Sequence, residues 1–313
     1  MKTTWKIAQA ELKSLFSSPI AWLILIIFTF QAGLGMSEKL SDEIRHIALY
    51  GHGYNLTGAI LAREMGSVFS DMLENLYLYI PLLTMGLMSK EYSSGSIKLL
   101  YSSPITNAQI ILGKYASMLV YSAVLMLVLL VFLFFGAGFI ENFDYPRAFT
   151  ALLGIFFLTC AYAAIGLFMS TLTAYQVVAA VGTLTVLALL NYVQNVGQNY
   201  DFVRDITYWL SLAGRSKQFL EGMICSEDIL YFFIVIGLFL SLSIFKLRFG
   251  RTTVPRIKKV SAYGCVIVVT LMLGYITSRP TMIAYYDTTD TKQNTLTPPS
   301  QEVLEKFKGD LSI

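Results

Sequence analysis

The chain has 313 residues, of which 55% are hydrophobic and only 14% carry a charge, with a formal net charge of +3. A soluble globular domain carries roughly 25% charged residues, so this composition excludes an ordinary soluble domain and indicates lipid as the solvent. The three cysteines, Cys160, Cys225 and Cys265, are scattered without a CxxC or Cys/His spacing. Neither a zinc site nor a disulfide framework is indicated, and we expect no metal and no cofactor.

The N-terminal segment 3–16 has an amphipathic pattern. Trp5, Leu12 and Phe16 recur at helical spacing on one side, and lysines such as Lys6 take the other. This pattern predicts a helix that lies in the plane of the membrane interface, with membrane lipid as its partner. An ordinary cytoplasmic stub is the alternative interpretation.

Seven apolar runs follow along the chain, and none has an Asp, Glu, Lys, Arg or His in its interior. A spanning helix needs about 20 mostly apolar residues, and its backbone groups have to be satisfied internally. We therefore predict seven transmembrane helices, at 20–36, 73–89, 115–139, 148–172, 175–197, 229–245 and 261–277. The segment 37–72 is then expected to be an outer loop, and 198–228 to form short helices at the outer interface.

The distribution of Lys and Arg predicts an N-terminus in the cytoplasm. With that orientation the inner segments hold 12 Lys and Arg against 2 acids, and the outer segments hold 11 against 18. The segment 246–260 alone carries six cations and no acid. Because short cytoplasmic loops are enriched in Lys and Arg, we expect a multi-pass protein of the inner, cytoplasmic membrane with an extracytoplasmic C-terminus. The same segment also has the composition of a patch for anionic lipids.

The cytoplasmic segment 90–114 is the most informative part of the sequence. Gly95 allows a sharp redirection of the backbone, and a short helix over 94–101 ends at a Ser-Ser-Pro sequence. Either Thr106 or Asn107 has the side chain to cap the helix that follows. The pattern predicts a short helix held on the cytoplasmic face between two breaks, a shape that suits docking into a partner's groove.

This segment resembles the ABC-2 type family of ABC-transporter permeases. The matching residues are Glu91, Gly95-Ser96, Leu99-Leu100, Ser103-Pro104 and Gly113-Lys114. The amphipathic start and the Phe-Leu-Glu-Gly stretch at 219–222 fit the same family. The resemblance implies a six-helix permease core over 1–250 that pairs with a second permease copy or homologue and with a cytoplasmic ATP-binding subunit. It further implies that this subunit grips the helix at 94–101, with five ATPase-coupling residues: Glu91, Gly95, Ser96, Leu99 and Leu100.

The C-terminal part of the chain resembles a subtype of that family. The stretches 286–290 and 294–298 are similar to the opening of the extracytoplasmic subunit of gliding-motility-type systems, which can be fused to the permease through an extra span. The expected organisation is therefore the permease domain at 1–250, a basic linker and seventh span at 251–278, and a truncated start of an extracytoplasmic domain at 279–313. We expect this last segment to belong to an incomplete outer domain or to hang loose.

The expected fold class is an all-α polytopic membrane protein, with the six-helix core, the seventh transmembrane helix and a short extracytoplasmic tail. No Gly-x-x-x-x-Gly-Lys-Ser/Thr sequence is present, so ATP hydrolysis is expected on a partner chain and not on this one. Two other functions stay open: a non-transporting anchor of an envelope or gliding-type complex, and an ion-coupled secondary transporter. The uncharged spans disfavour the second of these. We expect no nucleic-acid partner.

Overall fold

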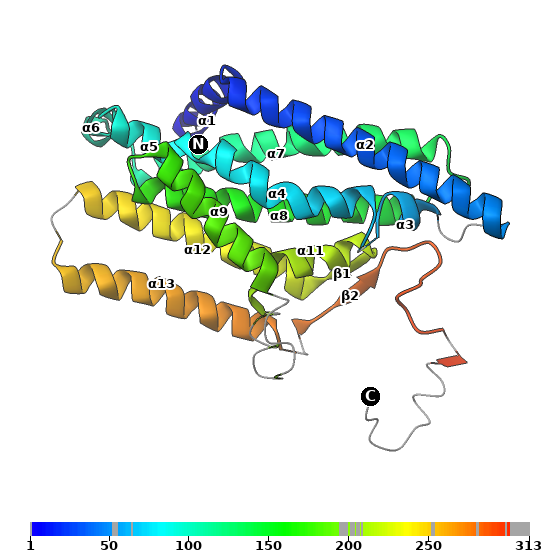
Figure 1. Cartoon of the computed structure of the whole chain (residues 1–313). Helices are drawn as coiled ribbons and strands as arrows, with labels where there is room; N and C mark the ends of the chain where they lie inside the picture. Colours follow the sequence, from blue (N-terminus) through cyan, green and yellow to red (C-terminus); the bar gives the residue numbers. More distant parts are fainter. Residues whose placement is uncertain are drawn as a thin grey trace, which may run out of the picture.

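The computed structural model is a bundle of long helices that run side by side (Figure 1). It describes residues 2–51, 56–63, 65–193, 200, 204, 207, 209–251, 254–279, 282–297 and 299–300. The expected all-α membrane fold is confirmed. The structure also contains a two-stranded antiparallel β-ribbon, which the sequence did not predict. We call the end of the bundle that carries α1 and α6 the α6 end, and the opposite end the ribbon end.

The helices in chain order are α1 (Lys2–Phe16), α2 (Pro19–Tyr50), α3 (Leu56–Ile60), α4 (Val68–Thr84), α5 (Gly86–Ser93), α6 (Ile97–Ser102), α7 (Asn107–Ala137), α8 (Tyr145–Leu172), α9 (Gln176–Tyr192), α11 (Leu212–Leu220), α12 (Ser226–Arg251) and α13 (Arg256–Thr277). The strands are β1 (Met223–Cys225) and β2 (Tyr285–Asp287). Among the described residues, α2, α7, α8, α12 and α13 are long and apolar enough to span a membrane individually. The other two predicted spans correspond to α9 and to the α4–α5 pair.

Helix α2 is much longer than the predicted first span. Ser18 caps its first turn, and the helix runs on to Tyr50, where Gly51 ends it with a left-handed φ of 81°. The amide of Gly51 donates to the Ile47 carbonyl at 2.8 Å. The prediction of an outer loop from residue 37 was therefore wrong. An apolar run predicts only the part of a helix that is suited to lipid. The backbone hydrogen bonds of α2 continue beyond that run through a polar sequence.

The second predicted span is broken at Met85, between α4 and α5. The Ser170 hydroxyl of α8 accepts from the amides of Met88 and Ser89 at 2.9 and 3.0 Å, and it donates to the Met85 carbonyl at 3.0 Å. One side chain thus satisfies three backbone groups that the break leaves without helical partners. A break within a membrane-spanning segment requires compensation of this kind, because lipid offers no hydrogen-bond partners.

Helix α8 is the centre of the bundle, since it contacts α4, α5, α7, α9, α11 and α12. Its apolar stretch is 72% buried, against 11% for α13, which lies at the periphery along α12 (Figure 1). Gly166 of α8 permits its closest approach to α4: a Cβ added there would lie 2.1 Å from Oγ1 of Thr84. Small residues of this kind let membrane helices pack closely.

We predict that Gly166→Ala destabilises the protein by about 1–3 kcal/mol, because the new methyl group overlaps the buried Thr84 side chain. Gly237→Ala in α12 is the matched control, since a Cβ there meets nothing within 4 Å. Unfolding temperatures of the two purified variants test this. Equal temperatures would show that α4 and α8 are not in contact at Gly166.

The tail after α13 is attached to the ribbon end of the bundle. Strand β2 pairs antiparallel with β1, and Thr288 donates through its amide to the Gly222 carbonyl at 2.9 Å. The buried Arg147 guanidinium of α8 reaches Glu221 at 2.8 Å and Gln293 of the tail at 3.4 Å. The expectation of a loose tail is therefore wrong for residues 282–297. Residues 298 and 301–313 of the expected extracytoplasmic segment lie outside the described residues.

Cys225 and Tyr285 face each other across the ribbon. They form the non-hydrogen-bonded pair of the ladder, because the backbone bonds run from Ser226 to Ala284 and from Thr288 to Gly222. We predict that Tyr285→Cys forms a disulfide with Cys225 under mild oxidation, whereas Tyr286→Cys does not. Loss of free thiol, followed by mass spectrometry, is the measurement. Equal cross-linking of both variants would contradict the register.

Candidate functional site

The turn between α5 and α6 has the shape that the sequence predicts. Gly95 adopts a φ of 76°, a region that side-chain-bearing residues avoid, and it redirects the chain into α6. After α6, Thr106 caps α7: it accepts from the Gln109 amide at 3.2 Å, and the Gln109 side chain accepts from the Thr106 amide at 3.0 Å. This capping box fixes where α7 begins.

Helix α6 has one face on the bundle and one face free. Ile97 is buried and Leu100 packs partly buried against the core. Leu99 is 73% exposed, on a short helix between α5 and α7 at the α6 end of the bundle. The two leucines of the predicted pair therefore have different roles: Leu100 holds α6 in place, and Leu99 presents an apolar surface.

Glu91 and Ser96 take part in a network within the protein. The ammonium group of Lys114 lies 3.1 Å from Glu91 and 2.8 Å from Glu11, and Lys114 is 3% exposed. The Ser96 hydroxyl donates to the second oxygen of Glu91. Residues from α1, α5, the α5–α6 turn and α7 are thus joined through one buried cation. The sequence pattern predicts Glu91 and Ser96 as site residues but not Glu11, whose partner is 103 residues away.

Burial by itself raises the pKa of the Glu91 carboxyl. The opposing effects of Lys114, of the Ser96 hydroxyl and of Lys90 are together larger, and they hold this pKa below its ordinary value of 4.5. Glu91 is therefore ionised at neutral pH, and the network consists of two carboxylates around one ammonium group. Charged hydrogen bonds of this kind are about twice as strong as neutral ones.

The amphipathic helix α1 packs against α7 through the side that carries Ile7 and Ala8. Ala8 is buried, and a Cβ at Gly113 would meet the Ile7 side chain at 2.8 Å. Leu12 is half-buried, and Phe16 packs against Trp22 and Tyr121. Trp5 is 52% exposed, on a helix whose lysines Lys2, Lys6 and Lys13 are also exposed. Helix α1 is therefore fixed to the bundle, while the Trp5 side chain remains exposed.

Arg251, at the end of α12, holds the C-terminal side of α6. Its guanidinium donates to the carbonyls of Tyr101, Ser103 and Ile105, the last two at 3.3 Å. The Tyr101 hydroxyl in turn donates to the Leu247 carbonyl at 3.4 Å. From the sequence, Arg251 is predicted only as part of a basic linker, because a contact across about 150 residues leaves no local pattern.

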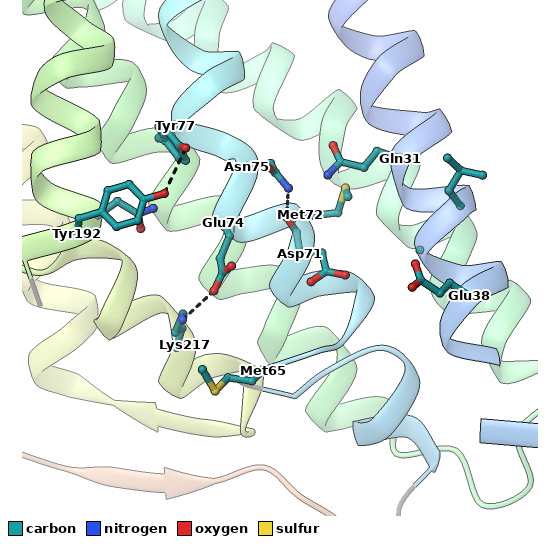
Figure 2. Close-up of a pocket in the computed structure, with 13 residues that line it drawn as sticks. Gln31, Glu38, Met65, Asp71, Met72, Glu74, Asn75, Tyr77, Tyr192 and Lys217 are labelled. Atoms are coloured by element: carbon teal, nitrogen blue, oxygen red, sulfur yellow. Dashed lines mark hydrogen bonds and ion pairs between the residues drawn. The ribbon is translucent and has the colours of Figure 1, made fainter. Parts of the chain in front are cut away.

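A polar pocket of about 520 Å³ lies nearer the ribbon end, between α2, α4, α9 and α11 (Figure 2). Its size is in the range of small-molecule sites. Its walls carry Gln31, Glu38, Asp71, Glu74, Asn75, Tyr77, Asn191, Tyr192 and Lys217, besides Met65 and Met72. None of these residues is predicted as a site from the sequence.

Two contacts connect the walls of this pocket. Lys217 of α11 pairs with Glu74 of α4 at 2.9 Å, and the hydroxyl groups of Tyr77 and Tyr192 lie 3.5 Å apart (Figure 2). Lys39 lies 3.9 Å from Asp71 at the rim. The pocket therefore offers both donors and acceptors at the junction of four helices.

The fold defines a multi-pass membrane protein: a helical bundle with a break between α4 and α5 and a short surface helix at one end. A family model described as ABC-2 family transporter protein matches residues 5–199, more than half of the chain. The chain belongs to this family. The comparison with curated proteins gave no match.

Family membership makes the chain the membrane component of an ABC transporter, a transport subunit that is not itself catalytic. It also implies association with a cytoplasmic ATP-binding subunit. The matched region includes α1 to α9 and therefore both the α6 segment and most of the pocket. Helices α11 to α13 and the ribbon follow the matched region.

Proposed function

We propose that the chain is the permease subunit of an ATP-driven transporter whose α6 end faces the cytoplasm and receives the ATP-binding subunit on α6. The observation that carries the proposal is the exposed Leu99 on a helix that Ile97, Leu100 and Arg251 attach to the bundle. An apolar side chain that is 73% exposed outside the spanning helices is a natural anchor for a partner's groove.

The contacts around α6 give a route by which movement of the partner would reach the spanning helices. Ser96 and Glu91 connect the α5–α6 turn to Lys114 at the start of α7. Ser170 connects the α4–α5 break to α8. A displacement of α6 would thus pull on α4, α7 and α8 together, and Gly95 would act as the point at which the chain pivots.

The polar pocket is proposed to form a wall of the substrate path, with a second copy or a homologue of the permease completing it. Its position between α2, α4 and α9 and its mixed charges support this role. We expect Glu74→Gln, which breaks the pair with Lys217, to lower transport several-fold while the ATP-binding subunit still binds. Lys39→Gln at the rim is the milder control. Unchanged transport in Glu74→Gln would remove the pocket from the path.

The part of the chain after α13 is proposed to begin an extracytoplasmic domain, as in gliding-motility-type permeases with a fused subunit. The attachment of residues 282–297 to the ribbon end supports this, because it places the tail at the end of the bundle opposite α6 (Figure 1). A cysteine at Lys292 should then react with a membrane-impermeant reagent added outside intact cells. Reaction only after lysis would reverse the proposed orientation.

Co-purification from the native membrane tests the proposed function as a whole. We expect the tagged chain to bring down an ATP-binding protein, and the purified complex to show two permease units and ATPase activity. Transport should stop on ATP depletion and continue when an uncoupler is added at constant ATP. Loss of transport on uncoupling alone would favour an ion-coupled transporter. The absence of any ATP-binding partner would favour a membrane anchor.

A further inference from the structure

A second hollow lies at the α6 end, where α12 and α13 meet the α5–α6 segment. It measures about 480 Å³, and Tyr92, Tyr101, Lys246, Phe249, Lys259 and Tyr263 are among its lining residues. The end of α8 and the turn between α8 and α9 form another wall, with Thr171 and Thr173. The hollow is separate from the polar pocket at the ribbon end, and transport as described above does not require it.

The charges that line this hollow are positive. Lys246 comes from the last turns of α12, Lys259 comes from the first turn of α13, and both are half-buried. No Asp or Glu is among the described residues that line it, and neither lysine forms an ion pair within the described part of the chain. The Lys259 ammonium group lies 5.9 Å from the centre of the Phe249 ring. Two ammonium groups without acidic partners favour a negatively charged occupant.

The other walls are aromatic. Phe249 and Tyr263 pack edge to face with ring centres 5.6 Å apart, and Phe245 stacks on Phe249. The two lysines lie just beyond the apolar runs 229–245 and 261–277, at the level where a bilayer's headgroups begin. A site with cations at headgroup level and aromatic rings beside them matches an amphipathic anion.

The hollow also borders α6. Tyr101, which lines it, is the residue whose carbonyl accepts from Arg251 and whose hydroxyl donates to Leu247. Its ring lies so close to α12 that a Cβ at Gly250 would meet the Tyr101 hydroxyl oxygen at 2.8 Å. An occupant of the hollow would therefore contact the side of α6 that is attached to the bundle.

We propose that this hollow binds the phosphate group of an anionic membrane lipid, with Lys246 and Lys259 as its two cationic contacts, and that the bound lipid stabilises the position of α6. The aromatic walls would cover the glycerol and upper acyl region. Phosphate is the chemistry that the lysines recognise, and the position at the membrane boundary favours a lipid over a free phosphate as its source.

Lipid retention by the full-length chain in its native complex tests the proposal. The complex is reconstituted in nanodiscs of phosphatidylcholine with a minor fraction of phosphatidylglycerol, and the co-purifying phosphatidylglycerol is measured by native mass spectrometry. We expect Lys246→Gln and Lys259→Gln each to weaken retention about fivefold. Lys258→Gln is the matched control, because Lys258 has the same charge and is adjacent to Lys259 but is exposed and does not line the hollow.

The outcomes separate the possibilities. Equal losses in Lys258→Gln and Lys259→Gln would overturn the proposal in favour of a diffuse basic surface. Competition by inorganic phosphate would overturn the lipid as the source. Lys246→Arg and Lys259→Arg should retain lipid, which separates loss of the charge from damage to the fold.

Discussion

Substitution of Lys114→Met is expected to destabilise the protein by about 3 kcal/mol, because it leaves two carboxylates facing each other without their cation. Lys114 is 3% exposed and lies 2.8 Å from Glu11 and 3.1 Å from Glu91. Removing one partner from a buried ion pair costs more than the pair contributes, since the remaining charge has no solvent to compensate it. Glu11 and Glu91 keep some contact with water, so we expect the lower part of the usual range.

Thermal unfolding of the purified protein in detergent measures this effect. Lys90→Met is the control, because Lys90 is an exposed lysine of the same segment. Adding Glu11→Gln and Glu91→Gln to Lys114→Met should restore most of the lost stability, as the repulsion disappears with the charges. If Lys114→Met and Lys90→Met had the same unfolding temperature, the network would not stabilise the α6 end.

Leu99→Asp is expected to reduce binding of the ATP-binding subunit by about 30-fold or more, which corresponds to roughly 2 kcal/mol for a central apolar anchor. The side chain is 73% exposed, so the permease itself should fold and unfold as before. Leu100→Asp should behave differently, because Leu100 packs against the core and its replacement introduces a charge there.

Co-purification yield and unfolding temperature, measured on the same variants, separate the two effects. Lys98→Asp is the control for Leu99→Asp, since Lys98 is the exposed neighbour on α6 and changes charge without losing an apolar contact. We expect Leu99→Asp to lose the partner at normal stability, and Leu100→Asp to lose stability. Normal binding by Leu99→Asp would place the docking surface elsewhere.

The sequence predicted most of the elements that lipid or backbone geometry determines. Apolar runs located the five described helices that are long and apolar enough to span a membrane, and the other two runs correspond to α9 and the α4–α5 pair. Gly95 predicted the turn before α6, and Thr106 was one of two predicted caps for α7. These features are local. A few adjacent residues determine the backbone conformation of a turn or cap, and a continuous apolar run determines whether a segment partitions into lipid. The extension of α2 to Tyr50 was missed because a polar helix outside lipid has no hydropathy signal.

The contacts that assemble the sites could not be predicted in the same way. Ser170 at the α4–α5 break, Glu11 beside Lys114 and Arg251 on α6 each join residues more than 80 positions apart. Serine, glutamate and arginine are common surface residues, and only the packing of α8, α1 and α12 gives them partners. The ribbon was missed for a related reason, since three residues such as Met223–Cys225 carry no strand pattern without their partner strand.

Site-specific cross-linking from α6 is the most direct test of the proposed docking of an ATP-binding subunit. A photoreactive residue at Leu99 is compared with one at Leu49, which is 77% exposed on the last turn of α2. We expect cross-links to an ATP-binding protein from position 99 in intact cells, and none from position 49. Cross-links from position 49 alone, or an absence of ATP-binding protein among the products from position 99, would contradict docking at the α6 end.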